Sequence, residues 1–425
     1  MNIAAIYELF LAHPNVTTDT RKITEGAIFF ALKGPNFNGN NFAANALAQG
    51  AAYCICDEKQ PTNDHRIIYT DDVLTTLQAI AKHHRQQFNI PFIAITGSNG
   101  KTTTKELVHA VLSEHYKCYT TVGNLNNHIG VPLTILSIKK DAEIAIIEMG
   151  ANHQKEIESY CTYTLPTHGL ITNCGKAHLE GFGGVEGVRK GKGELFKYLA
   201  SNNGTAIINT DLDYLVPMSA GIKNIVTYGT QNGRITGFVK NDAHFVEVSI
   251  NHNETLQSIH TQLAGGYNIA NILSAVCIGK LFNVPDEKIK NALEHYTPSN
   301  SRSQIIIKDT NTIILDAYNA NPSSMKAAIE NFAHMEGNKK VVIIGGMMEL
   351  GEDSVAEHTA IIKLLQKYHW YHVVLAGKDY VNVPETYLKF DDASAIANWY
   401  HQQQFENTHI LIKGSRAMAM EKVLG

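Results

Sequence analysis

Short apolar runs alternate with amphipathic stretches along most of the chain, a pattern typical of strands and helices in an α/β fold. Phe92–Thr96 is the clearest apolar run, because it is short, rich in β-branched residues and followed at once by small polar residues. Because helical stretches separate runs of this kind, we predict a central, doubly wound and mostly parallel sheet. Its other strands are predicted at Ala145–Glu148, His168–Thr172, Ala206–Asn209 and Ile225–Tyr228.

The same alternation predicts a smaller unit on each side of this sheet. We expect an N-terminal α/β domain over residues 1–88, the central domain over 89–298 and a Rossmann-like α/β domain over 299–425. The first unit has predicted strands at Ala27–Leu32 and Ala52–Cys56 and helices at Phe42–Gln49 and Leu74–Gln87. The third has predicted strands at Thr312–Asp316, Lys340–Ile344, His372–Ala376 and Thr408–Ile412.

Composition excludes several classes of protein. The 425 residues are 44% hydrophobic and 18% charged, and the net charge of −4 gives no basic footprint for nucleic acid. No apolar run reaches the ~18 residues that a membrane span needs, and Met1–Pro14 predicts a short helix rather than a signal peptide. The six cysteines form no C-x-x-C pair. We therefore expect a cytoplasmic protein that binds neither nucleic acid nor membranes.

A small-residue loop, Gly97–Gly100, connects the first central strand to a helix that opens with Lys101 and Thr102. Such a loop can cradle phosphates with its N–H groups, while the lysine reaches the outer phosphates and the threonine ligates Mg²⁺. The strict motif has glycine where Ile95 stands, and the alternative is an ordinary glycine turn. A lysine in the first helical turn opposes the helix dipole, however, which favours a bound anion. The nucleotide-binding residues predicted here are Gly97, Ser98, Asn99, Gly100, Lys101, Thr102 and Thr103.

Polar residues also follow the neighbouring strands of the predicted central sheet. Glu148 ends one strand, His178 follows the next, and Lys192 lies in the predicted helix Glu186–Lys197. Each has an ordinary alternative: a solvated carboxylate, a capping or satisfied loop histidine, and a solvated basic face. Because the carboxyl ends of parallel strands meet in one crevice, Glu148 and His178 together predict a second Mg²⁺ site behind the phosphate loop.

Paired amides and basic residues give weaker signals. Asn126 and Asn127 either hold a polar substrate or phosphates or belong to a turn-rich loop. Asn268 and Asn271 share one helical face, where they either read a purine edge or cap the helix. In the first unit, Arg21, Lys33 and nearby loop amides could bind a phosphorylated ligand, although residue types alone favour ordinary turns.

Motifs in all three units resemble those of the Mur ligases. TGSNGKTTTKE, IIEMGANHQKEI and AHLEGFGGVEGVRKGKGELF resemble the family generally, whereas DAYNANPSSM, ELG-x-x-S-x-x-EH and KGSRAM resemble its tripeptide-extending branch. The resemblance implies ATP-dependent addition of D-alanyl-D-alanine to UDP-N-acetylmuramoyl-tripeptide through an acyl phosphate, in peptidoglycan precursor synthesis. It implies ATP, two Mg²⁺ ions and small-molecule substrates, and we expect a monomer. A ligase of the same build with another acceptor, or a nucleotide-dependent switch or kinase, are the rivals.

The resemblance also implies a role for each matching residue. Lys101 would hold the ATP phosphates, Thr102 one Mg²⁺, and Glu148 and His178 the second, with Lys192 carbamylated at the metal site. Adenine, phosphates and ribose would contact Asn268, Asn271, Arg302 and Asp316. The cleft near the incoming dipeptide would be lined by Asn319, Asn321, Lys413, Ser415 and Arg416. Uridine diphosphate would contact Asp19, Arg21, Lys33 and Phe37–Asn41, and Asn126 and Asn127 stay candidates for holding the substrate.

Three segments depart from the family pattern. Thr20 stands where serine is expected, Asn38-Gly39-Asn40 where Asp-Gly-His is expected, and Gly345-Gly346-Met347 where Gly-Asp-Met is expected. The first change is chemically mild. The second bears on the uridine contacts and the third on the acceptor-side contacts.

Overall fold

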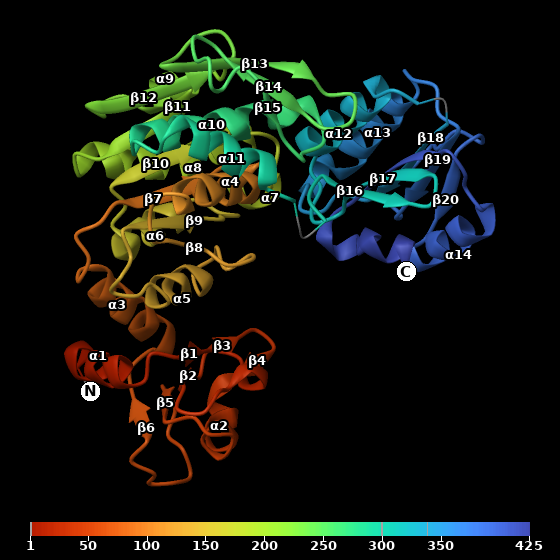
Figure 1. The fold of residues 1–425 in the computed structure, drawn as a ribbon. Helices are drawn as coiled ribbons and strands as arrows, with labels where there is room; N and C mark the ends of the chain where they lie inside the picture. The colour runs from red at the N-terminus through yellow and green to blue at the C-terminus, as the bar shows by residue number, and fades with distance from the viewer. Residues whose placement is uncertain (1, 299–300, 338) are drawn as a thin grey trace.

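A computed structural model describes residues 2–298, 301–337 and 339–425. The chain forms three lobes in sequence order, coloured red to orange, orange to teal, and cyan to blue in Figure 1. The central lobe contacts each of the other two. No helix in the described part of the chain is long and apolar enough to cross a membrane.

The N-terminal lobe is built on a four-stranded parallel sheet in the order β1-β2-β5-β6. Helix α3 (Val73–Arg85) leads from it into the central lobe, and its first turn is capped by Asp72, which accepts from the Thr75 N–H. The other elements are α1 (Ile3–Ala12), β1 (Val16–Thr17), β2 (Ile28–Phe30), β3 (Lys33–Gly34), β4 (Phe37–Asn38), α2 (Ala43–Ala48), β5 (Tyr53–Cys56) and β6 (Ile67–Tyr69).

The central lobe has a nine-stranded sheet in the order β15-β14-β13-β12-β11-β10-β7-β9-β8. Strand β7 (Phe92–Thr96) is completely buried and lies between two parallel neighbours. The predicted parallel strands are confirmed within a residue or two. Their bounds, with that of the added strand β8, are β8 (Cys118–Thr120), β9 (Ile144–Glu148), β10 (His168–Ile171), β11 (Thr205–Asn209) and β12 (Asn224–Gly229).

Alternate residues of β7 face two different layers of helices, as the pleat of a strand requires. Ile93 and Ile95 share a core with α4 (Lys101–Ser113) and α10 (Ile269–Leu281). Phe92 and Ala94 share the opposite core with residues of α6 (Glu156–Thr164) and α8 (Val185–Ser201), among others. The remaining helices of this lobe are α5 (Gly130–Leu136), α7 (Leu179–Phe182), α9 (Leu215–Met218) and α11 (Asp286–His295).

An antiparallel extension, β13 to β15, was not predicted. It adds β13 (Ile235–Asn241), β14 (Glu247–Ile250) and β15 (Ile259–His260) beside β12. β13 is mostly exposed or half-buried and β15 has only two residues, and the clearest pattern in this region is the buried alternation of Val246, Val248 and Ile250.

The C-terminal lobe has a six-stranded sheet in the order β16-β17-β21-β18-β19-β20, parallel except for the edge strand β16. Its elements are β16 (Gln304–Lys308), β17 (Asn311–Asp316), α12 (Pro322–His334), β18 (Lys340–Gly345), α13 (Ser354–Leu365), β19 (His372–Ala376), β20 (Leu388–Phe390), α14 (Ala393–Gln403) and β21 (His409–Lys413). The predicted Rossmann-like layout is therefore present. The domain boundaries at 88/89 and 298/299 stay a prediction, and residues 299–300 lie outside the described residues.

Candidate active site

A cavity of about 730 Å³ lies at the carboxyl ends of β7, β9 and β10, where the C-terminal lobe meets the central lobe. Most of the predicted site residues line it: Ser98, Asn99, Gly100, Lys101, Thr102, Thr103, Asn126, Asn127, Glu148, His178, Asn268, Asn271, Arg302, Asp316, Asn319, Asn321 and Lys413. The other predicted residues do not line it: Gly97, Lys192, Ser415 and Arg416, and Asp19, Arg21 and Lys33 of the N-terminal lobe.

The loop after β7 needs its two glycines. Gly97 has φ +145° and Gly100 φ +78°, which side chains rarely adopt. A Cβ atom would lie 1.9 Å from the Thr172 Oγ1 at the first position and 2.6 Å from the Asn271 Oδ1 at the second. The Thr172 hydroxyl also donates to the Asn99 carbonyl at 2.6 Å, so the end of β10 holds the loop in place.

Lys101 begins α4, and its amine turns back over the loop. Its Nζ donates to the carbonyls of Gly97 at 2.7 Å and Ser98 at 3.1 Å. Burial lowers the pKa of Lys101 to about 8, with Arg302 adding to the decrease and Glu148 opposing it. The loop carbonyls carry only partial negative charge, so an anion in the cavity would be a stronger partner for this amine.

Glu148 ends β9 with a fully buried carboxylate. Its Oε1 accepts from the Thr102 hydroxyl at 3.0 Å and from the Asn126 amide at 2.7 Å. Its Oε2 is buried and has no hydrogen-bond partner among the described residues. A buried carboxylate oxygen without a partner is costly, so Glu148 fits a site that takes a cation. Since no three His, Cys, Asp or Glu side chains cluster in the described part of the chain, water or phosphate would complete such a site.

His178 faces this cavity and makes contact with the C-terminal lobe. Its Nδ1 is hydrogen-bonded to the Glu349 carboxylate, and this bond is the main reason that the pKa of Glu349 is lowered. His178 precedes α7 without capping it. The alternative of a histidine with satisfied hydrogen bonds therefore holds for Nδ1, although the partner, Glu349, belongs to another lobe. Nearby, Lys176 and Glu357 form a second bridge at 2.5 Å.

The two amides at the start of α10 form a chain of hydrogen bonds rather than a helix cap. The Asn271 Nδ2 donates to the Asn268 Oδ1 at 2.8 Å, and the Asn268 Nδ2 donates to the Ala264 carbonyl at 2.8 Å. The Thr104 hydroxyl donates to the Asn271 Oδ1 at 3.0 Å. These bonds fix the orientation of both amides at the wall of the cavity.

The C-terminal lobe contributes a charged pair and a direct contact with the loop. Lys413 is buried and donates to the Asp316 carboxylate at 2.5 Å. Asn321 caps α12 by accepting from the Ser324 N–H at 3.0 Å, and its amide donates to the Asn99 Oδ1 at 2.7 Å. The phosphate loop and the C-terminal lobe are therefore joined by side chains that the sequence predicted separately.

Arg302 lies on the ring of Tyr318, with 3.6 Å between the guanidinium carbon and the ring centroid. Arg416 is at 5.7 Å from the same ring and pairs with Glu421 at 3.3 Å. The Arg302 Nε is buried and has no hydrogen-bond partner among the described residues. Tyr318 had no predicted role. Its place in the sequence between the predicted site residues Asp316 and Asn319 could have indicated that it belongs to the site.

Models of three protein domains match the chain. The Mur ligase family catalytic domain matches residues 14–90, the Mur ligase middle domain 95–279, and the Mur ligase glutamate ligase domain 301–416. A UDP-N-acetylmuramoyl-tripeptide–D-alanyl-D-alanine ligase of Bacillus subtilis is 33% identical over 100% of this chain and 96% of its own. The chain belongs to the Mur ligase family.

Two solved Mur ligases have the same fold over nearly the whole chain. MurF from Acinetobacter baumannii is 30% identical, with a TM-score of 0.87 over 96% of this chain and 92% of its own. MurF from Thermotoga maritima, solved in complex with ADP, is 27% identical, with a TM-score of 0.86 over 97% of each chain. Use of ATP therefore agrees with both the family and the geometry of the phosphate loop.

Lys192 requires two corrections to the expectations for this Mur ligase. It is buried, so the alternative of a solvated basic face is wrong. The comparisons give no support for a carbamate, and the carbamate prediction is also corrected: the amine donates to the Ala151 carbonyl at 2.9 Å and lies 4.9 Å from the centre of the Phe182 ring. Burial lowers the pKa of Lys192 well below its ordinary value, and Lys101 adds to this effect.

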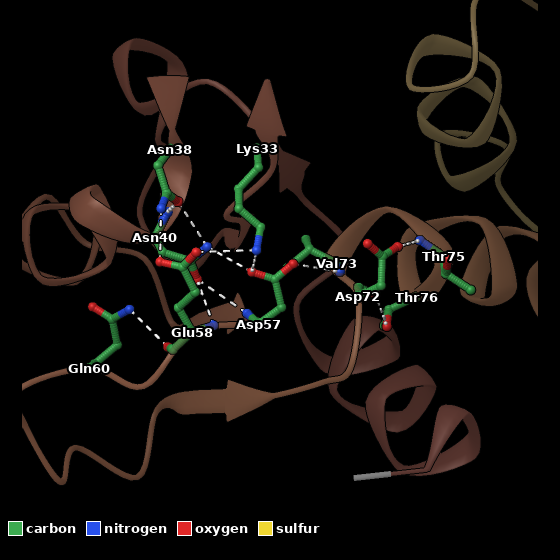
Figure 2. A network of polar contacts seen from close by, with 10 residues as sticks. All are labelled: Lys33, Asn38, Asn40, Asp57, Glu58, Gln60, Asp72, Val73, Thr75 and Thr76. Carbon is green, nitrogen blue, oxygen red and sulfur yellow. Dashed lines mark hydrogen bonds and ion pairs between the residues drawn. The ribbon is translucent and has the colours of Figure 1, made fainter. Parts of the chain in front are cut away.

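In the N-terminal lobe of this Mur ligase, the two cationic side chains predicted to bind phosphate form ion pairs with carboxylates. Figure 2 shows Lys33 directed toward Asp57, at 3.1 Å, and Glu58, at 3.2 Å. The hydrogen bond to Asp57 is the main reason that the pKa of Lys33 is raised. Arg21 likewise pairs with Asp19 at 2.8 Å, and their hydrogen bonds lower the pKa of Asp19 to about 2.

The segment Asn38-Gly39-Asn40, which departs from the family pattern, joins the same network. The Asn38 amide donates to Glu58 at 2.8 Å, and the buried Asn40 amide donates to Asp57 at 2.8 Å (Figure 2). Sequence reasoning missed both carboxylates, because they follow β5 and are far in sequence from the residues that they contact.

Proposed function

We propose that the protein joins D-alanyl-D-alanine to UDP-N-acetylmuramoyl-tripeptide with hydrolysis of ATP. The observation that carries this proposal is the cavity between the central and C-terminal lobes. It combines a phosphate loop, the buried carboxylate of Glu148 and the Asp316–Lys413 pair around one space. The named relatives act on these substrates, and the chain matches one of them over its full length.

The reaction proceeds in two steps. The terminal carboxylate of the tripeptide attacks the γ-phosphorus of ATP, which forms an acyl phosphate and releases ADP. The amine of the dipeptide then attacks the acyl carbon, and the tetrahedral intermediate releases phosphate and a proton as the amide forms. Lys101 and the N–H groups of the loop bind the phosphates that carry developing charge. Catalysis thus comes from positioning and charge neutralisation, without an enzyme nucleophile.

Two Mg²⁺ sites fit the residues at the cavity. Thr102 would hold one ion together with the nucleotide phosphates, and Glu148 and His178 would hold the second. When bound, Mg²⁺ neutralises phosphate charge and polarises the oxygens that it contacts. The buried Oε2 of Glu148, without a partner in the described structure, supports this assignment.

The three lobes divide the substrates between them. Residues 1–88 bind the uridine diphosphate through Asp19, Arg21 and Lys33, residues 89–298 bind ATP, and residues 299–425 close over both and receive the dipeptide. Asn268 and Asn271 recognise adenine with their remaining hydrogen-bonding groups, and Arg302 and Asp316 contact the phosphates and ribose. Asn126 and Asn127 lie nearer the tripeptide, while Asn319, Asn321, Lys413, Ser415 and Arg416 border the acceptor side.

A monomeric enzyme is part of the proposal, and size-exclusion chromatography with light scattering tests it. The proposed substrates, ATP and a UDP-linked precursor, support action in the cytoplasm.

The test of the function is phosphate release from ATP and UDP-N-acetylmuramoyl-tripeptide, with and without D-alanyl-D-alanine. We expect sustained release only with the dipeptide, together with one amide product per phosphate. A nucleotide switch or kinase would instead be indicated by hydrolysis or transfer that does not depend on the dipeptide. A ligase with another acceptor would use a single amino acid in its place.

A further inference from the structure

We propose that Glu349 of the C-terminal lobe is a positioning residue that orients His178 toward a divalent cation, so that this cation site is complete only when the two lobes touch. The inference rests on the proposed function in one respect, the assignment of His178 as a metal ligand. Glu349 itself had no predicted role.

The hydrogen bond between the two side chains determines which imidazole nitrogen remains available. A carboxylate accepts hydrogen bonds, so the His178 Nδ1 donates its proton to Glu349. In the neutral ring the Nε2 then carries the lone pair, which is the form that binds a metal. A carboxylate behind a ligating histidine fixes both its tautomer and its ring orientation.

The backbone on both sides of the contact is held in an uncommon conformation. His178 has φ +52° and Glu349 has φ +60°, in the left-handed region that residues other than glycine seldom adopt. Such conformations cost free energy and persist where the surrounding structure enforces them. Two of them meet here through their side chains, one from each lobe.

The turn that carries Glu349 is supported from both sides. Behind it, the Met347 N–H donates to the Nε2 of the buried His358 at 3.0 Å. In front, Gly351 lies beside Glu180, where an added Cβ would be in ordinary contact with the Cβ of Glu180 at 3.4 Å. The Lys176–Glu357 bridge joins the same two segments. The turn is therefore docked on the loop that carries His178 by contacts other than the Glu349 carboxylate.

The simplest alternative is an interlobe ion pair with no effect on a metal. Half of the Glu349 side chain is exposed, and exposed pairs contribute little to stability. The two explanations differ in one observable. An ordinary ion pair leaves cation affinity unchanged when it is removed, whereas loss of a positioning carboxylate weakens it about 10- to 100-fold.

The experiment measures Mn²⁺ binding to the full-length, ADP-saturated enzyme by electron paramagnetic resonance. The variants are E349A, E349Q, H178A and, as the matched control, E352Q, which changes an exposed glutamate of the same turn. For E349A, we expect Mn²⁺ binding at the site of Glu148 and His178 to be about 10- to 100-fold weaker. E349Q should lose less, because its amide oxygen still accepts from Nδ1. E352Q should match the parent enzyme.

A spectroscopic readout separates orientation from general electrostatics. Electron spin echo modulation from a ligated imidazole nitrogen should be absent in H178A and reduced in E349A at equal Mn²⁺. Wild-type binding and modulation in E349A, with both lost in H178A, would overturn the inference and leave the proposed function intact. Wild-type behaviour in H178A would overturn the ligand assignment and the inference together. Thermal melting confirms that each variant is folded.

Discussion

Two polar regions of the molecule differ in whether their charged side chains are paired. One is the cavity between the central and C-terminal lobes, and the other is the polar network of the N-terminal lobe. In the cavity, the Glu148 Oε2 and the Arg302 Nε are buried without hydrogen-bond partners among the described residues. In the N-terminal lobe, Lys33 and Arg21 already rest on carboxylates of their own lobe. The cavity is thus preorganised for ligands of both signs, whereas the N-terminal lobe must exchange a carboxylate for a phosphate when it binds one.

The largest effect should come from removing the cation of the phosphate loop. K101A removes a charge that the loop backbone cannot replace, and we expect the rate of phosphate release to fall about 10²- to 10³-fold. Steady-state kinetics with all three substrates measures this loss. A decrease of less than fivefold would show that the cavity does not depend on Lys101.

The second prediction tests the charge of Glu148 with a substitution that keeps the shape of the side chain. E148Q keeps an oxygen that can accept from Thr102 and Asn126 but removes the negative charge, so we expect about a 100-fold loss of activity. The thermal midpoint of the nucleotide-free protein should not fall, because the substitution replaces a buried negative charge by a neutral amide. Loss of stability together with activity would instead assign Glu148 a structural role.

The N-terminal network predicts effects of opposite sign on one substrate. K33A should raise the KM for the UDP-linked substrate about 10-fold with little change in kcat, since a charge-assisted contact to phosphate is lost. E58Q should lower the same KM severalfold, because it removes one of the two carboxylates that compete for Lys33. If K33A and E58Q both have the KM of the parent enzyme, Lys33 only stabilises the lobe.

The last prediction is the pH dependence of nucleotide binding. Burial lowers the pKa of Lys101 to about 8 in the free protein, so ADP affinity should be full below pH 8 and fall as pH rises above it. The decrease should approach 10-fold per pH unit. K101R should abolish it, because arginine stays protonated. Calorimetric titration between pH 6.5 and 9.5 measures both, and a flat profile in the parent enzyme would contradict the burial effect.

Part of this site could be read from the sequence, because strand ends obey a local rule. The loop after β7, Glu148 at the end of β9 and Asp316 at the end of β17 each follow an apolar run, and parallel packing brings them to the same cavity. Contacts between elements that are distant in sequence, within one lobe or between two, could not be read in this way. No periodicity relates His178 to Glu349, or Lys33 to Asp57, because each pair depends on how separate elements dock.

The same limit explains why two ordinary alternatives, a solvated Lys192 and a helix cap by Asn268 and Asn271, do not hold. Lys192 lies in a run of basic and glycine residues that is typical of a solvated helix face, yet α8 turns it into the interior. The Asn268 and Asn271 amides have the spacing of a helix cap, yet they bond to each other and to Ala264. Tertiary packing decided both outcomes, and the local sequence carried no signal for it.

In the proposed reaction, ATP activates a carboxylate in the cavity before an amine attacks it. The most direct measurement follows ¹⁸O from the terminal carboxylate of the labelled tripeptide in a complete reaction with ATP and D-alanyl-D-alanine. We predict that each phosphate released carries one ¹⁸O atom, because the acyl phosphate oxygen leaves with phosphorus. Phosphate without label, formed at the same rate as the amide, would contradict this account.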